Sequence, residues 1–197
     1  MALKAKKCRV CRERFETNYS NRVVCSIKCS IELVQKNKAK KAAKERSEKR
    51  KKLREAKERI KTRSDWMKDA QKAFNAWVRE RDHVEPCISC GKFVNNDGLI
   101  TGSRADAGHY RSVGACPELR FTEENCHLQC VRCNRDLSGN SVAYRIGLIE
   151  RIGLEKVEWL EGNHPPKKYT IEDLKGICRH YRAEARRLGK LRQEKAA

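Results

Sequence analysis

Two short cysteine pairs decide how the middle of this 197-residue chain folds: PCISCG at residues 86–91 and NCHLQCVRCN at residues 125–134. Two residues lie inside each pair, and 39 residues separate Cys90 from Cys130. Pairs of this kind form knuckles that meet in one tetrahedral zinc site. The alternative is a set of reduced cysteines that only fill space. We predict a structural zinc ion with four thiolate ligands: Cys87, Cys90, Cys130 and Cys133.

A second cysteine quartet lies near the N-terminus. Its pairs contain two and three intervening residues, and Ser26 is placed to cap a short helix that carries the last cysteine. No apolar leader follows the initial methionine, so we expect a cytosolic chain, where cysteines favour metal over disulfides. We therefore predict a second structural zinc ion, held by Cys8, Cys11, Cys25 and Cys29.

The charge of the chain indicates a polyanionic partner. There are 46 Lys and Arg against 26 Asp and Glu, a formal net charge of +20. Nucleic acid is the natural ligand for such a balance. No apolar run reaches the roughly 20 residues that a membrane span needs, so no membrane role is expected. Hydrophobic residues make up 39%, which is low for one large core.

Much of the positive charge is concentrated between residues 36 and 63, where 15 Lys or Arg and 4 Glu leave a net charge of +11. The run contains no Gly or Pro and has high helix propensity, so it predicts one long helix. A solvated face without a partner is the alternative. In a nucleic-acid-binding protein it would supply sequence-independent phosphate contacts. We predict such contacts for the densest part of the run: Lys49, Arg50, Lys51 and Lys52.

Composition divides the chain into four segments: a zinc knuckle at 1–32, a basic helical arm at 33–63, a zinc-stapled core at 64–153, and C-terminal helices with a basic tail at 154–197. The third segment should begin with a helix capped by Ser64 or Asp65. Its apolar face is expected to consist of Trp66, Ala70, Ala73, Phe74 and Trp77.

Further helices are indicated after the second cysteine pair. One should end at Gly153, with an apolar face of Val142, Ile146, Ile149 and Ile152. Another is expected over Leu154–Leu160, and Thr170 with Asp173 resembles a capping box that opens a last helix. Residues 86–125 are rich in Gly, Pro and Asn and should form loops with one or two brief strands.

The residues between the cysteine pairs and directly after them resemble the motif of HNH endonucleases. That motif runs from a His on a first strand, through a loop Asn, to a His or Asn directly after a CxxC pair. In this chain the corresponding residues are His109, Asn125 and Asn134. The resemblance implies a mostly helical α+β protein with a small treble-clef-like ββα-metal core, stapled by zinc and flanked by helices.

A wider resemblance covers nearly the whole chain. The N-terminal knuckle, the basic run, RERD at 79–82, PCISCG at 86–91, DAGHYR at 106–111 and SGN at 138–140 resemble the NinG (Rap) recombination proteins of lambdoid phages. This implies a structure-specific endonuclease of phage recombination that cuts branched DNA such as Holliday junctions and D-loops. Phage or host recombination proteins are possible partners. Symmetric cutting of a four-way junction would also need two active sites, which suggests a homodimer.

The family pattern implies a role for each residue. His109 would be the general base that activates water, and Asn125 would hold the His-bearing strand. Asn134 would bind a catalytic Mg²⁺ or Mn²⁺ through its amide oxygen, and Arg111 would contact DNA. Many HNH sequences place a metal ligand directly before the base, where this chain has Gly108. Asp106 is the nearest carboxylate, and we expect it to reach the ion only if the strand bends or bulges.

Two other functions compete with this interpretation. The first is a non-catalytic zinc protein that binds DNA or loads a recombinase, in which His109 would be incidental. The second is an HNH enzyme that nicks duplex DNA by sequence. A surface Asp that fixes a turn is the alternative for Asp106, and His127 is expected to pack near the zinc or to contact phosphate.

Overall fold

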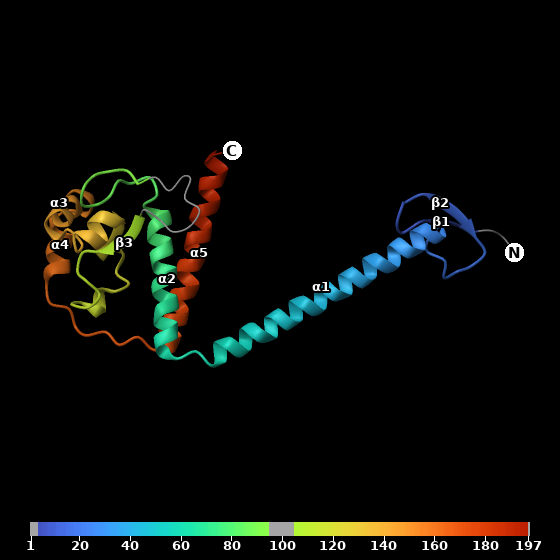
Figure 1. Ribbon diagram of the computed structural model, residues 1–197, viewed down its shortest axis with the longest axis horizontal. Coiled ribbons are helices and arrows are strands. Elements are labelled where there is room, and N and C mark those ends of the chain that lie inside the picture. Colours follow the sequence, from blue (N-terminus) through green and yellow to red (C-terminus); the bar gives the residue numbers. More distant parts are fainter. Residues whose placement is uncertain (1–3, 95–104, 197) are drawn as a thin grey trace. The chain divides into compact units, whose positions relative to one another are not determined.

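The computed structural model describes residues 4–94 and 105–196 and forms two compact units, Met1–Ile60 and Lys61–Ala197 (Figure 1). This division differs from the four segments expected from composition. One helix runs unbroken through the boundary at 32/33. The C-terminal helix shares a core with the segment that begins at Lys61, so residues 154–197 are part of the second unit.

The first unit contains a short hairpin and one long helix. Strands β1 (Lys4–Lys7) and β2 (Arg14–Thr17) pair antiparallel, with Lys4 opposite Thr17. Helix α1 (Ile27–Arg59) begins at the N-cap Ser26, whose hydroxyl accepts a hydrogen bond from Cys29 N at 3.3 Å. The predicted cap is confirmed, but the helix that it opens is not short, because it continues through the predicted arm to Arg59.

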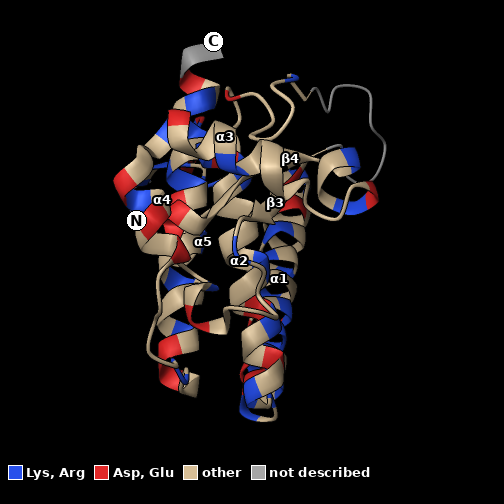
Figure 2. Cartoon of the chain, turned by 90° about the vertical axis from the view of Figure 1, so that its left-hand side faces the viewer, with Lys and Arg blue, Asp and Glu red and all other residues tan. Residues whose placement is uncertain are grey.

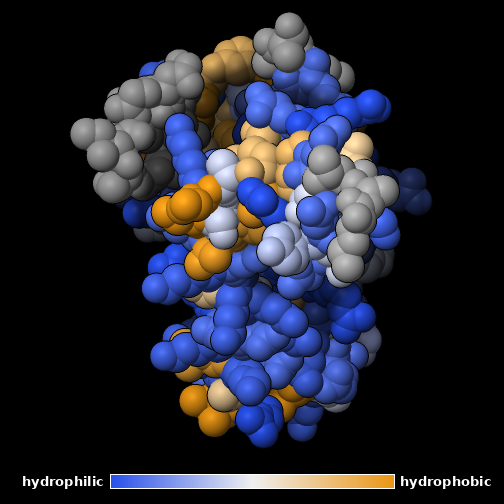
Figure 3. Space-filling view, turned by 90° about the vertical axis from the view of Figure 1, so that its right-hand side faces the viewer, coloured by the Kyte–Doolittle hydropathy of each residue, from blue (hydrophilic) through white to orange (hydrophobic). Residues whose placement is uncertain are grey.

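Helix α1 is exposed along its length and carries Lys and Arg in repeated bands (Figure 2). Cys29 is its single buried residue. Pairs such as Glu32–Lys36, at 2.7 Å, support the helix at i,i+4 spacing. On the face shown in Figure 3, hydrophilic residues predominate and apolar residues form small separate groups. Within the described residues, no helix is both long and apolar enough to cross a membrane.

The second unit is built on two helices that lie side by side, α2 (Arg63–Arg81) and α5 (Ile171–Ala196) (Figure 1). The five apolar residues predicted for the buried face of α2 are all buried. Phe74 and Tyr181 meet edge to face with ring centroids 4.9 Å apart. Such aromatic contacts join the two helices into one core.

Helix α2 begins earlier than predicted. Its N-cap is Thr62, whose hydroxyl accepts from Asp65 N at 3.2 Å, while the Asp65 carboxylate accepts from Thr62 N at 3.0 Å. This reciprocal capping box satisfies two backbone donors. The N-cap is therefore Thr62, and neither Ser64 nor Asp65 as predicted. The capping box predicted at Thr170 and Asp173 is confirmed, with the corresponding bonds at 2.9 and 3.1 Å.

A two-stranded ribbon lies next to this helical pair. Strand β3 (Ala105–His109) pairs antiparallel with β4 (Cys126–Cys130), and His109 lies opposite Cys126. Short 3₁₀ turns at Pro117–Leu119 and Glu123–Asn125 precede β4, and a π-helical turn follows at Arg132–Asp136. Helices α3 (Ser141–Ile152) and α4 (Leu154–Glu161) complete the unit. The structure is α+β and mostly helical, as predicted.

The buried face of α3 differs from the predicted one. Val142 and Ile146 are 76% and 58% exposed, whereas Tyr144 and Leu148 are buried. The Tyr144 hydroxyl donates to Gly108 O at 2.9 Å and accepts from His127 N at 3.1 Å. Because the Tyr144 ring is buried and its hydroxyl has hydrogen-bond partners on the ribbon, α3 turns the face that carries Tyr144 toward the ribbon. The face that carries Val142 and Ile146 is therefore exposed.

Helix α3 also closely approaches the knuckle formed by Cys87 and Cys90, at Gly147. A Cβ at this position would lie 2.0 Å from Ile88 O, whereas nothing lies within 4 Å of a Cβ at Gly176 in α5. We expect Gly147→Ala to lower the free energy of unfolding by about 1–3 kcal/mol because of overpacking. Gly176→Ala, as the matched control, should raise it by roughly 0.5–1 kcal/mol.

Urea denaturation at fixed zinc concentration, followed by tryptophan fluorescence, measures both changes, since Trp66, Trp77 and Trp159 all belong to the second unit. Equal stability of the Gly147→Ala protein and the parent would contradict the close packing of α3 on the knuckle.

Candidate catalytic and metal sites

The four cysteines of the second unit converge as their spacing predicts. All four sulfurs lie within 4.8 Å of one another, and Cys90 Sγ is 3.9 Å from Cys130 Sγ. Zinc–sulfur bonds of about 2.3 Å in a tetrahedron place sulfurs about 3.8 Å apart. The donor set and its spacing therefore fit a structural zinc ion.

Backbone amides support the anionic form of these sulfurs. Cys130 N donates to Cys87 Sγ at 3.3 Å, and Cys133 N donates to Cys130 Sγ at 3.4 Å. The Asn140 side chain donates to Cys133 Sγ at 3.6 Å. Hydrogen bonds from such donors stabilise thiolates, the form that binds zinc.

The four cysteines of the first unit also form one cluster, with all sulfurs within 4.8 Å of one another. Cys25 Sγ lies 3.5 Å from Cys11 Sγ and 3.6 Å from Cys29 Sγ. Cys8 comes from the turn after β1 and Cys29 from the first turn of α1. This cluster can likewise hold a zinc ion.

His109 lies at the end of β3, and both of its ring nitrogens have partners. Nε2 is 3.0 Å from Arg120 O, and Nδ1 is 3.6 Å from Cys126 Sγ. A carbonyl oxygen only accepts, so Nε2 carries the hydrogen and Nδ1 is the basic nitrogen. The Phe74 ring packs nearby, with centroids 6.1 Å apart. The fold thus fixes one tautomer of the imidazole.

The surroundings of His109 keep it neutral. Burial lowers the pKa of His109, and the positive charge of Arg120 lowers it further, against the opposing effect of the hydrogen bond to the Arg120 carbonyl. Burial also raises the pKa of the Cys126 thiol, which is therefore protonated and a weak donor to Nδ1. A neutral imidazole has a lone pair on its unprotonated nitrogen and is suited to accept a proton.

Asp106 and Asn134 lie together on another part of the ribbon. Asn134 Nδ2 donates to Asp106 Oδ2 at 3.0 Å, and Arg135 donates to both carboxylate oxygens at 2.8 Å. Burial would raise the pKa of Asp106, but the bonds from Arg135 and Asn134 outweigh it and lower the pKa. Asp106 is therefore an ionised carboxylate next to the Asn134 amide, which directly follows Cys133.

The bend or bulge that Asp106 would need to reach an ion beside His109 is absent, because residues 105–109 pair with 126–130 without interruption. Alternation along a regular strand directs Asp106 and His109 to opposite faces of the ribbon. Gly108 is needed for another reason, since a Cβ there would lie 2.2 Å from Gln129 Oε1. Gln129 is fully buried, and its amide nitrogen donates to Ser89 Oγ and Gly139 O, both at 2.7 Å.

Asn125 is fully buried and holds the loop that follows β3. Its Oδ1 accepts from Arg111 N at 2.8 Å, and its Nδ2 donates to Arg111 O at 3.0 Å and to Leu119 O at 3.2 Å. The Arg111 side chain is only partly exposed, whereas Lys49, Arg50, Lys51 and Lys52 are exposed on α1.

Sequence reasoning did not identify the ion pair between Arg81 and the buried Asp82, which contacts β4. Asp82 accepts from Arg81 at 2.6 Å and from Leu128 N at 2.9 Å, and His127 Nδ1 is 3.1 Å from Arg81 Nη2. Despite burial, these bonds hold the pKa of Asp82 well below its usual range. His127 is buried in this network, which gives it a structural environment.

Arg135 and Cys126 were also missed as neighbours of the candidate site. Arg135 directly follows Asn134, so a basic residue at that position was the available signal. Cys126 lies outside both CxxC pairs, and its proximity to His109 depends on the strand register.

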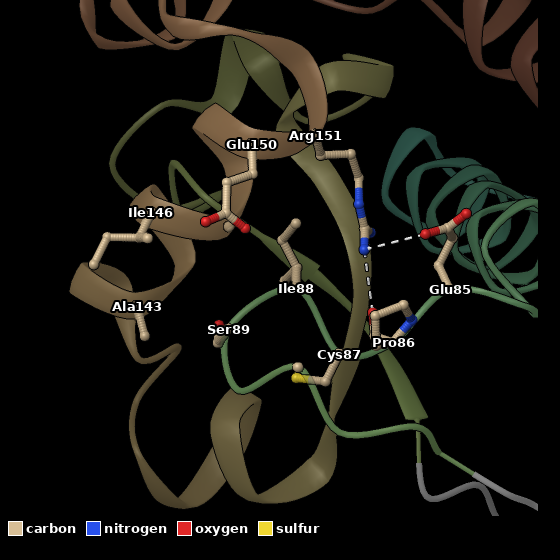
Figure 4. Close-up of a pocket in the computed structure, with 11 residues that line it drawn as sticks. Glu85, Pro86, Cys87, Ile88, Ser89, Ala143, Ile146, Glu150 and Arg151 are labelled. Carbon is tan, nitrogen blue, oxygen red and sulfur yellow. Dashed lines mark hydrogen bonds and ion pairs between the residues drawn. The ribbon is translucent and has the colours of Figure 1, made fainter.

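A cleft of about 420 Å³ lies between the Cys87–Cys90 knuckle and α3 (Figure 4). Arg151 spans one side of it and donates to Pro86 O at 3.2 Å, with Glu85 3.6 Å away. None of His109, Asp106 and Asn134 lines this cleft.

Comparisons with known proteins identify the family. The family model described as "Bacteriophage Lambda NinG protein" matches residues 1–192. The chain is 46% identical to Protein ninG of Escherichia phage lambda, over 94% of this chain and 93% of that protein. It is 45% identical to Protein ninG of Salmonella phage P22, over 94% of each, and 44% identical to that of Escherichia phage 933W, over 97% of each. No solved structure matches. The chain therefore belongs to the NinG family of lambdoid phages.

Proposed function

We propose that this protein is a metal-dependent, structure-selective DNA endonuclease of phage recombination that cuts branched DNA such as Holliday junctions and D-loops. The observation that carries the proposal is the 3.0 Å contact between Asp106 and Asn134. Asp106 lies on β3, the strand that bears His109, and Asn134 directly follows Cys133 of the second cysteine cluster. Membership of the HNH superfamily is part of the proposal.

Asp106 and Asn134 offer the hard oxygen donors that Mg²⁺ and Mn²⁺ prefer. Arg135 now holds the carboxylate, but its side chain is 63% exposed and free to leave when another cation takes its place. The Asn134 amide would then turn its oxygen, instead of its nitrogen, toward the site. When bound there, the ion would stabilise charge on the phosphate and on the leaving 3′ oxygen.

His109 would act as the general base through Nδ1. Its hydrogen bond to Arg120 O sets the tautomer, and the proton taken from water would replace the weak contact with Cys126. Asn125 would keep the loop 111–119 in place, which keeps Arg120 near the imidazole. General-base assistance of this kind contributes roughly 10²- to 10⁴-fold to a rate.

The ribbon supports a position for the scissile phosphate. Asp106 contacts Asn134 on one face of β3, and alternation along the strand directs His109 to the other face. A phosphodiester bound across the strand would have the residues that hold the ion on one side and the residue that activates water on the other.

The preference for branched DNA comes from the family resemblance and agrees with the exposed basic helix α1, which offers phosphate contacts without base readout. Labelled four-way junction and matched duplex, incubated with Mg²⁺, Mn²⁺ or EDTA, test the proposal. We expect junction cleavage with a divalent ion and little cleavage of duplex.

The same assay separates the alternatives. Binding without cleavage under every metal condition would favour a zinc protein that only binds DNA or loads a recombinase. Equal cutting of duplex and junction would favour a sequence-reading nickase. Either result would contradict the proposed function.

A further inference from the structure

We propose that α5 carries a DNA-backbone contact surface of its own, formed by Arg179, Arg186 and Lys190, whose ligand is the phosphate backbone of a duplex arm. We call these three residues the α5 stripe. The proposal rests on the proposed function in taking DNA as the polyanion. It adds a surface in the second unit to the contacts predicted for α1 in the first.

The spacing of the stripe places it on one face of the helix. Its members are seven and four residues apart, which at 3.6 residues per turn keeps them within about 40° of one another and along about 16 Å. All three are exposed. Leu174, Cys178 and Tyr181 are buried against α2. The same periodicity places them about 100° to 160° around the helix from Arg179, so the stripe points away from the core.

The charges of the stripe have no acidic partner within 4.0 Å among the described residues. Their basic neighbours on α5 do: Arg182 is 3.9 Å from Asp69, Arg187 is 2.8 Å from Glu184, and Arg192 is 3.0 Å from Glu80.

Like charges at i,i+4, as at Arg186 and Lys190, cost an isolated helix roughly 0.2–0.5 kcal/mol. The three cations of the stripe therefore weaken the helix slightly and have no negative partner on this face in the described part of the chain. Such an arrangement is expected where a bound anion supplies the negative charge. Lys and Arg bands along α5 are visible in Figure 2.

The stripe is also coupled rigidly to the candidate catalytic strand. Tyr181 packs in one cluster with Ala107 of β3 and Cys126 of β4, and its hydroxyl donates to Glu123 Oε1 at 3.0 Å. Cys126 is the residue whose sulfur contacts His109. A phosphate held by the stripe would therefore lie at a fixed position relative to His109, and backbone contacts of this kind set the register of DNA in a site.

DNA fits this helix better than an anionic membrane does. A membrane-surface helix inserts an apolar face below its charges, but the apolar face of α5 is already buried against α2. Over the 16 Å of the stripe, duplex DNA presents roughly ten phosphates, at one charge per 1.7 Å of axis.

Salt-dependent binding of the full-length chain tests the proposal. The probes are labelled four-way junction and linear duplex in EDTA, so that binding is measured without cleavage. The variant is Arg179→Gln with Arg186→Gln and Lys190→Gln, since Gln keeps helix propensity. The control is Lys156→Gln with Lys167→Gln and Lys168→Gln, which removes the same charge from exposed residues elsewhere in the second unit.

We expect the stripe variant to lower the slope of log Kd against log salt by roughly 0.9 per lost phosphate contact, or roughly 2.7 for all three. The control should leave the slope within error of the parent. Equal slopes for both variants, changed or unchanged, would overturn the proposal. The proposal would also be overturned if the stripe variant no longer bound phosphatidylglycerol vesicles while its slope of log Kd for DNA against log salt stayed that of the parent.

Cleavage by the parent protein with Mg²⁺ or Mn²⁺ is measured in parallel. If the parent cuts junctions and the stripe slope does not change, only the inference about α5 fails. If the parent does not cut and the slope falls as expected, the proposed nuclease activity fails and the DNA surface stands.

Discussion

His109→Ala is expected to slow cleavage of a four-way junction by roughly 10²- to 10⁴-fold, because it removes the nitrogen assigned to take a proton from water. DNA affinity measured in EDTA should stay that of the parent, since His109 lies among Phe74, Arg120 and Cys126 and contributes no positive charge near neutral pH. Single-turnover cleavage of labelled junction with saturating enzyme measures the chemical step directly.

Two further variants keep this test decisive. His109→Gln retains a donor for Arg120 O but has no basic nitrogen, so it should lose as much activity as the alanine variant. His83→Ala removes an exposed imidazole that hydrogen-bonds to Glu80 O, and should cut at the parent rate. A His109→Gln protein that is folded and cuts normally would exclude His109 as the base.

The pH dependence of the same rate gives an independent readout. Burial lowers the pKa of His109 below 6.5, so the imidazole stays neutral as the pH falls through that value. The cleavage rate should therefore be flat above pH 6.5 and fall only at lower pH, where Nδ1 becomes protonated. An inflection above pH 7 would mean that another group limits the reaction.

The parts of the structure that could be predicted from sequence are those determined by local spacing. The cysteine pairs required no knowledge of the fold, since two residues between sulfurs already favour a knuckle. The arm α1 followed from propensity, and the buried face of α2 followed from apolar residues at helical spacing. Each of these depends on neighbours within one or two turns.

The candidate site depends on the pairing of distant segments. Asp106 meets Asn134 because β3 and β4 pair in one register and the chain then turns back at Arg132–Asp136. A one-residue shift in that register would move every side chain to the other face. Likewise, the buried face of α3 is set by the hydrogen-bond partners of the Tyr144 hydroxyl, which lie on β3 and β4. Helical periodicity within α3 gives no information about these partners.

Loss of zinc is the change with the largest expected effect on stability. Among residues 4–60 only Cys8, Thr17 and Cys29 are buried, and two of these are zinc-cluster cysteines. In a unit with so little core, a bound zinc ion would contribute on the order of 10 kcal/mol toward holding the hairpin against α1. We expect Cys8→Ser to reduce the zinc content from two ions per chain to one and to unfold the hairpin.

The two clusters can be distinguished because all three tryptophans lie in the second unit. Cys8→Ser should leave tryptophan fluorescence unchanged, whereas Cys130→Ser should alter it and abolish cleavage, since Cys130 ends β4 and precedes Asn134 by four residues. Cys178→Ala, a buried cysteine between α2 and α5 that belongs to neither cluster, should keep both ions.

Zinc content measured by atomic emission, together with circular dichroism, decides the outcome. Helix content should fall little in the Cys130→Ser protein, because the α2–α5 core contains no zinc ligand and α1 has its own propensity. Two ions retained by either serine variant would contradict four-thiolate coordination at that cluster. A Cys130→Ser protein that loses one ion but still cuts junctions would instead show that cleavage does not depend on the zinc-bound knuckle that positions Asn134. That result would remove the main support for the proposed ion site.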